Sequence, residues 1–212
     1  MINGRWHRAI AFILLIVTAL SILTSCDRSY NEDEVVAAAK ELLPKAAILN
    51  SVYYGDGIYA SANGYQNGNY YEADLLYLDK LGFDTVAELE ALTMQTFSAT
   101  YASSIIDYYL HPAPDGEPYR MVRYYQVYDL DDPTVPVRIM VNSKHKPIFD
   151  DRLTYHLDTV KAVGSTRNVV NMTVEATVVS AYGNEKRMTI DFTLYEEKLG
   201  WRISSTCFAN YY

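Results

Sequence analysis

The spacing of hydrophobic positions changes twice along this 212-residue chain. An unbroken apolar run fills residues 9–20. From Val35 to Tyr53 apolar residues recur every three to four positions, a period that predicts helix. Pro44 lies inside this stretch, so it either kinks one long helix or begins a second one. Beyond about residue 119 apolar and polar residues alternate, which predicts strands.

Two further helices are predicted between these regions. Asp84 or Thr85 is placed to cap the first helix, and Glu88 has the spacing of a capping box. Ser98 is placed to cap the second helix, which should run to about Leu110.

The alternating part of the chain divides into six strand segments, near residues 119–128, 135–141, 153–163, 169–179, 187–194 and 201–208. Such alternation is typical of an antiparallel sheet with one wet face. Glu197 to Gly200 form the predicted turn of a terminal hairpin. Helices first and strands afterwards predict an α+β domain, with the helices packed on one face of a strongly bent antiparallel sheet.

A segment rich in glycine and asparagine, residues 55–70, separates the first helix from the next and predicts a long exposed loop. Long loops in compact domains are usually functional or mobile. Tyrosine is abundant, with 20 in the chain. Exposed tyrosines suit contact with sugars, peptides or proteins, although an aromatic core explains many of them equally well. The candidate contact residues are Asp56, Tyr65, Tyr70 and Tyr71.

The start of the chain has the order of a secretory signal. Arg5, His7 and Arg8 precede the apolar run. The stretch from Ala9 to Ser25 is shorter than the roughly 20 residues that a membrane-spanning helix needs. A signal anchor is the second reading of this segment.

The sequence Leu23-Thr24-Ser25-Cys26 resembles the lipobox of bacterial lipoproteins. The resemblance implies a signal peptide over 1–25, lipidation of Cys26 after cleavage, and an extracytoplasmic protein held on a membrane by its acyl chains. The alternative is that Cys26 has no role in lipidation and only happens to follow an apolar segment that is too short to span a membrane. We expect a short acidic tether over 26–34 and one domain over 35–212.

Charge and cysteine content exclude several classes of function. The formal net charge is -8 at pH 7, and loss of the first 25 residues makes the chain still more acidic. An acidic surface does not attract nucleic acid or support a polybasic membrane patch. Once Cys26 carries lipid, only Cys207 remains, so neither an internal disulfide nor a cysteine metal site can form. We expect Cys207 to be a buried, inert thiol.

The element order, ending in a hairpin at Gly200-Trp201-Arg202-Ile203, resembles the nuclear-transport-factor-two-like or cystatin-like cone fold over roughly residues 35–212. The stretch LLPKAAILNSVYYGDGI is also similar to secreted proteins with cystatin-like domains, which include inhibitors of cell-wall endopeptidases. Enzymes of the cone superfamily project an Asp and His, or a Tyr and Asp, into the cone. This sequence contains no motif that identifies which of its residues would occupy those catalytic positions.

The best polar cluster for catalysis is His156 and Asp158, which period two places on one strand face. A histidine oriented by a carboxylate can act as a general base. The same alternation is found in any half-exposed strand. A second cluster, Asp129, Asp131 and Asp132, lacks the glycine and terminal glutamate of a calcium loop, so we expect no metal site.

The sequence therefore predicts a lipid-anchored binding or protein-interaction module of the cell envelope, with no cofactor. Its partner would be cell-wall peptide, glycan or another envelope protein. Inhibition of a cell-wall hydrolase is one of the roles that this prediction covers. The alternative is a small cone-fold hydrolase, isomerase or dehydratase that uses His156 and Asp158.

Overall fold

The computed structural model describes residues 30–111, 122–127, 138–146, 152–166, 168–180 and 183–208. The signal segment, Cys26 and the Asp129–Asp132 cluster lie outside these residues. The helices are α2 (Glu32–Tyr53), α3 (Leu75–Leu81), α4 (Val86–Thr96) and α5 (Ala99–Tyr109). The strands are β1 (Gln66–Asn67), β2 (Tyr70–Glu72), β3 (Tyr124–Val127), β4 (Arg138–Asn142), β5 (Arg152–Thr166), β6 (Val169–Val179), β7 (Glu185–Glu197) and β8 (Gly200–Ile203).

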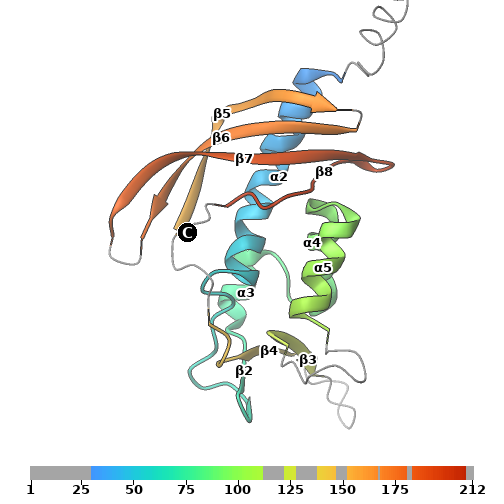
Figure 1. Cartoon of the computed structure of the whole chain (residues 1–212). Helices are drawn as coiled ribbons and strands as arrows, with labels where there is room; N and C mark the ends of the chain where they lie inside the picture. The colour runs from blue at the N-terminus through green and yellow to red at the C-terminus, as the bar shows by residue number, and fades with distance from the viewer. Residues whose placement is uncertain are drawn as a thin grey trace, which may run out of the picture.

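The class is α+β, and the described strands form two antiparallel sheets (Figure 1). The large sheet has the order β5-β6-β7-β8, and the small sheet has the order β1-β2-β4-β3. The sequence predicted one sheet. The first two predicted strand segments belong instead to the small sheet, because β4 pairs with strand β2 of the hairpin formed by the glycine-rich loop, and β3 pairs with β4.

Helix α2 is one continuous helix that contains Pro44. It begins earlier than predicted, at Glu32, because the side chain of Asn31 caps it by accepting from the Asp33 backbone N–H at 3.1 Å. Three acidic residues in the first turn favour this start through the helix dipole. Pro44 lies on the exposed side, where water can replace the hydrogen bond that proline cannot donate.

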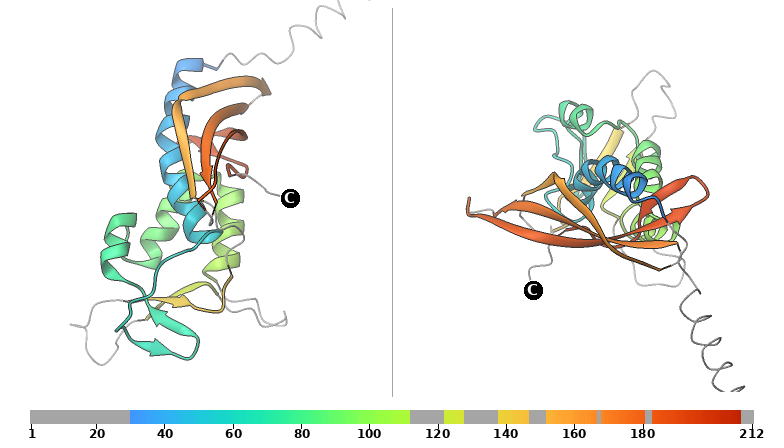
Figure 2. Two further views of the ribbon diagram at one scale, coloured as in Figure 1. Left: turned by 90° about the vertical axis from the view of Figure 1, so that its left-hand side faces the viewer. Right: turned by 90° about the horizontal axis from the view of Figure 1, so that it is seen from above.

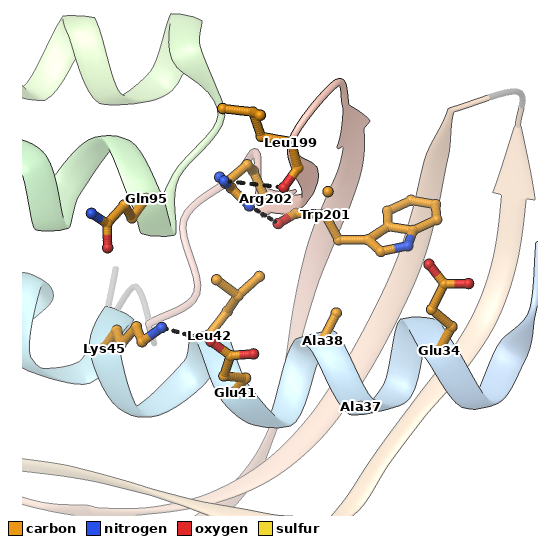
Figure 3. A pocket seen from close by; sticks show the side chains of 11 residues that line it. Glu34, Ala37, Ala38, Glu41, Leu42, Lys45, Gln95, Leu199, Trp201 and Arg202 are labelled. Atoms are coloured by element: carbon orange, nitrogen blue, oxygen red, sulfur yellow. Dashed lines mark hydrogen bonds and ion pairs between the residues drawn. The ribbon is translucent and has the colours of Figure 1, made fainter.

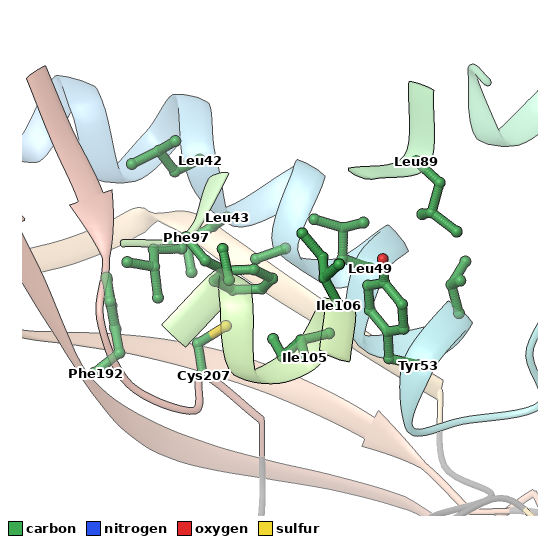
Figure 4. Close-up of a cluster of buried hydrophobic side chains, with 14 of the residues drawn as sticks. Leu42, Leu43, Leu49, Tyr53, Leu89, Phe97, Ile105, Ile106, Phe192 and Cys207 are labelled. Carbon is green, nitrogen blue, oxygen red and sulfur yellow. The ribbon is translucent and has the colours of Figure 1, made fainter. Parts of the chain in front are cut away.

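The main core lies between α2 and the large sheet, and α2 runs along one face of that sheet (Figure 2). Alternation in β7 is confirmed: Ile190, Phe192 and Leu194 are buried, and the intervening Thr189 and Asp191 are exposed. Leu42, Leu43 and Leu49 of α2, with Phe97 and Ile105, pack into the same cluster (Figure 4).

The predicted caps of the next two helices are partly confirmed. Thr85 and Glu88 form a complete capping box at the start of α4. Ser98 occupies the cap position of α5, but its side chain makes no capping hydrogen bond. The Glu197 carboxylate on β7 caps α5 instead, accepting from the Ala99 backbone N–H at 2.8 Å. A partner so distant in sequence cannot be read from a local motif.

The small sheet is attached to the end of α2 by buried polar contacts. Arg123 is only 4% exposed and donates to the carbonyls of Tyr53 at 2.5 Å and Gly55 at 2.7 Å. The Tyr124 hydroxyl donates to the Val52 carbonyl at 2.6 Å. These groups satisfy the carbonyls of Val52 and Tyr53, which the helix end leaves without intrahelical partners, and that of Gly55 just beyond it, and a cation is favoured at this end of the dipole.

Candidate functional site

The structure does not bring the side chains of His156 and Asp158 into contact with each other. The His156 ring shares a hydrogen bond with the Thr177 hydroxyl at 2.8 Å, whereas the Asp158 side chain is exposed. No hydrogen bond or ion pair joins the two residues in the part of the chain that the structure describes. A carboxylate that faces water and does not touch the imidazole cannot fix its tautomer.

A bulge in β5 changes the strand at this position. The register shifts between the pairs His156–Glu175 and Lys161–Thr173. The Thr159 hydroxyl fills the gap in the ladder, donating to the His156 carbonyl at 2.7 Å and accepting from the Glu175 N–H at 2.9 Å. Period two therefore fails at Asp158, since extra residues on one strand reset the alternation of faces.

Asp56 lies in a tight turn after α2. Its side chain is exposed, but the flanking Gly55 and Gly57 are buried. Gly57 has a φ of +81°, and a Cβ at this position would overlap the guanidinium of Arg123 and the hydroxyl of Tyr124. Turn geometry and close packing therefore account for the Gly-Asp-Gly sequence, and they leave the Asp56 carboxylate available to solvent.

The three candidate tyrosines lie together on the hairpin of the small sheet, but their side chains differ in hydrogen bonding and in exposure to solvent. The Tyr70 hydroxyl donates to the Val122 carbonyl at 2.9 Å, and its ring packs edge-on against Tyr125. The Tyr71 hydroxyl accepts from the Gln66 amide at 3.0 Å. Only the ring of Tyr65 is largely exposed, at 48%. Tyr65 is therefore the best contact residue of the three.

Salt-bridged neighbours hold Tyr65 in place. Its backbone N–H donates to a Glu72 carboxylate oxygen at 2.8 Å, and the other oxygen of Glu72 lies 3.4 Å from Arg138 Nε. The Arg138 guanidinium lies 5.8 Å from the centre of the Tyr65 ring. The exposed ring thus stands on an ordered support, with a cation–π contact that fixes its orientation.

An exposed apolar patch lies beside this hairpin and was not predicted. It consists of Tyr59, Leu75 and Leu76, which are 52%, 59% and 76% exposed, and we call it the distal patch. The Asp74 N–H donates to the Tyr59 carbonyl at 2.8 Å, and the rings of Tyr59 and Tyr77 are 4.4 Å apart, so Tyr59 lies against the start of α3. The sequence does contain a sign of this patch. The helix that follows Asp74 begins with Leu75 and Leu76, and helical periodicity places these two leucines outside the core.

A groove of about 490 Å³ lies between the first half of α2 and the turn that joins β7 to β8 (Figure 3). Lys45 is paired with Glu41 at 2.8 Å, and Arg202 donates to the Trp201 carbonyl at 2.8 Å. The hydrogen bond and charge of Lys45, with a smaller effect of Arg202, lower the pKa of Glu41. Lys45 and Glu41 are thus ion-paired with each other, Arg202 is bonded to the backbone, and the groove presents a mixture of charged and apolar side chains.

Cys207 is completely buried, as predicted, and its thiol accepts from the Asn50 amide at 3.3 Å. Burial raises its pKa. The Tyr155 hydroxyl donates to the Cys207 carbonyl, and burial raises the pKa of Tyr155 as well. A neutral thiol enclosed by Phe97 and Ile105 is not a nucleophile (Figure 4).

Within the described ranges, no group of three or more His, Cys, Asp or Glu side chains is arranged to hold a metal ion. No helix in those ranges is both long enough and apolar enough to cross a membrane. The sequence matches no protein-family model and has no significant match among curated proteins.

Proposed function

We propose that this protein is a lipid-anchored, extracytoplasmic interaction module of a bacterial cell envelope. The acyl chains on Cys26 hold it at a membrane, and the distal patch and Tyr65 contact its partner. The partner is an envelope protein or a component of the cell wall. The exposed leucines favour a protein, since exposed apolar side chains close to one another in sequence are the kind of surface that proteins bury in contacts.

The observation that carries this proposal is the position of the distal patch. Helix α2 has 22 residues and is therefore about 33 Å long. It starts six residues after Cys26, and the small sheet and α3 lie beyond its other end (Figures 1 and 2). An anchor at Cys26 would thus leave the distal patch on the side of the molecule that faces away from the membrane.

The proposal extends to fold family. One long helix against a four-stranded antiparallel sheet supports a cystatin-like or cone-like arrangement for α2 and β5–β8. The small sheet with α3 is then an addition to that core, inserted between its helix and its strands in the sequence. The enzyme alternative gains no support, because Asp158 is exposed and separate from His156.

Lipid anchoring is tested by expressing the wild-type chain and Cys26→Ala in a bacterial host. The wild-type protein should fractionate with membranes and carry the mass of acyl chains, whereas the variant should lose both properties. An unmodified Cys26 in the wild-type protein would refute the anchor.

The interaction surface is tested by placing a photo-crosslinking amino acid at Leu76 in the intact envelope. The matched control is the same amino acid at Val163, which is 56% exposed on the large sheet. We expect a discrete adduct from position 76 that is absent from position 163 and is reduced by Tyr59→Ser. Equal labelling from both positions would refute a specific surface.

A further inference from the structure

A second cleft, separate from the distal patch, lies where the start of α5 meets the large sheet. Its volume is about 390 Å³, within the range of roughly 300–1,000 Å³ found for small-molecule sites. It is lined by Ser98, Thr100, Tyr101, Ser104, Tyr195, Glu197 and Ser204. The Ser98 N–H donates to the Ile203 carbonyl at 2.8 Å, so strand β8 fixes the helix start against the sheet.

The lining has an unusually uniform chemistry. All of its residues except Glu197 carry a hydroxyl group, and no lysine or arginine is among them. Three of these hydroxyls are not used by the fold: in the described part of the chain the side chains of Ser98, Thr100 and Tyr195 make no hydrogen bond. Free hydroxyl groups both donate and accept, which matches a ligand that is itself rich in hydroxyls.

Two aromatic rings and one carboxylate complete the cleft. Tyr195 lines the cleft and is 38% exposed, so its ring is accessible to a ligand there. The Tyr101 hydroxyl lies 3.4 Å from the Tyr54 hydroxyl, and burial raises the pKa of Tyr101, so that phenol stays neutral. One oxygen of Glu197 accepts from the Ala99 N–H, which holds this carboxylate of the lining in place and leaves further lone pairs for a ligand.

From this arrangement we propose that the cleft binds a neutral sugar ring, such as one unit of an envelope glycan. The apolar face of the ring stacks on Tyr195, and its hydroxyls bond to the serine and threonine hydroxyls and to Glu197. The carboxylate and the lack of cations in the lining disfavour anionic ligands. This site goes beyond the proposed function, since it requires neither the lipid anchor nor the distal patch.

The test uses the purified full-length chain in a polyoxyethylene detergent, because alkyl-glycoside detergents would compete. The probes are an array of neutral hexose and N-acetylhexosamine oligosaccharides, followed by calorimetry with the strongest binder. We expect saturable binding that Tyr195→Ala weakens at least about tenfold, while Tyr195→Phe keeps it within about threefold. Tyr108→Ala, which removes a tyrosine 52% exposed on α5 outside the lining, should leave binding unchanged.

Choline serves as the counter-probe, because two tyrosines and a carboxylate could also hold an ammonium group. Binding of choline in place of sugars would overturn the proposal. So would an array without saturable binding, or sugar binding that Tyr195→Ala leaves intact while thermal melting shows a folded protein. None of these three results bears on membrane fractionation or on crosslinking from Leu76, so the two proposals fail separately.

Discussion

The two sheets of this protein are stabilised by different means. The large sheet packs an alternating row of aliphatic and aromatic side chains against α2, as in β7 with Ile190, Phe192 and Leu194. The small sheet is short, and side-chain hydrogen bonds from Arg123 and Tyr124 attach it to the end of α2. Removing side-chain volume from an apolar core leaves a cavity. Removing one partner of a buried hydrogen bond leaves the other partner unsatisfied. The two regions should therefore respond to different substitutions.

The largest effect is expected in the large sheet. Phe192→Ala should lower the free energy of unfolding by about 3–5 kcal/mol, because it removes a ring that is 2% exposed and leaves a cavity. Urea denaturation followed by circular dichroism measures the change. Val163→Ala, at an exposed position on β5, should change the free energy by less than about 0.5 kcal/mol. Similar losses in both variants would contradict the assigned core.

The attachment of the small sheet is tested next. Arg123→Leu should cost about 2–4 kcal/mol, since the carbonyls of Tyr53 and Gly55 each lose a buried donor. Hydrogen exchange should show the loss first in β3 and β4, with β6 still protected. Arg138→Leu is the control: this arginine pairs with Glu72 near the surface, and its loss should cost at most about 1 kcal/mol. Uniform loss of protection across both sheets would mean that Arg123 does not act locally.

How far the sequence predicts the molecule also differs between the regions. Periodicity identified β5 to β8, the inward face of β7 and the terminal hairpin, because a long amphipathic pattern reports burial directly. It also identified the capping box of Thr85 and Glu88. It missed the separate small sheet, since strands of two to five residues carry little pattern and are defined by distant pairing. The β5 bulge likewise has no local signature, and for this reason the structure does not bring His156 and Asp158 together as period two predicts.

A substitution in the turn that follows α2 should have a smaller effect on stability, and it tests a single contact. Gly57→Ala should cost about 1–3 kcal/mol, because a φ of +81° is unfavourable for alanine and its Cβ would overlap the Arg123 guanidinium. Gly68→Ala provides the matched control. Gly68 has a φ of +60°, but a methyl group at this position would meet nothing within 4 Å, so only the conformational cost of about 1 kcal/mol applies. Equal effects in urea denaturation would show that the Arg123 contact contributes nothing.

The smallest effect is the pH dependence of stability that His145, just after β4 of the small sheet, contributes. Burial, with the charge of Arg123, lowers the pKa of His145 from 6.5 to about 4. The unfolded chain therefore binds a proton between these two pH values while the folded chain does not, so this histidine destabilises the fold as pH falls from 6.5 toward 4. His145 is only half-buried, and solvent screening reduces the effect to on the order of 1 kcal/mol. Wild-type and His145→Gln proteins should be compared by urea denaturation at pH 7 and pH 5, because carboxylates titrate equally in both and cancel in the difference. The wild type should lose more stability than the variant over this interval; an equal or smaller loss would mean that the imidazole beside Tyr109 is as accessible to protons as in the unfolded chain.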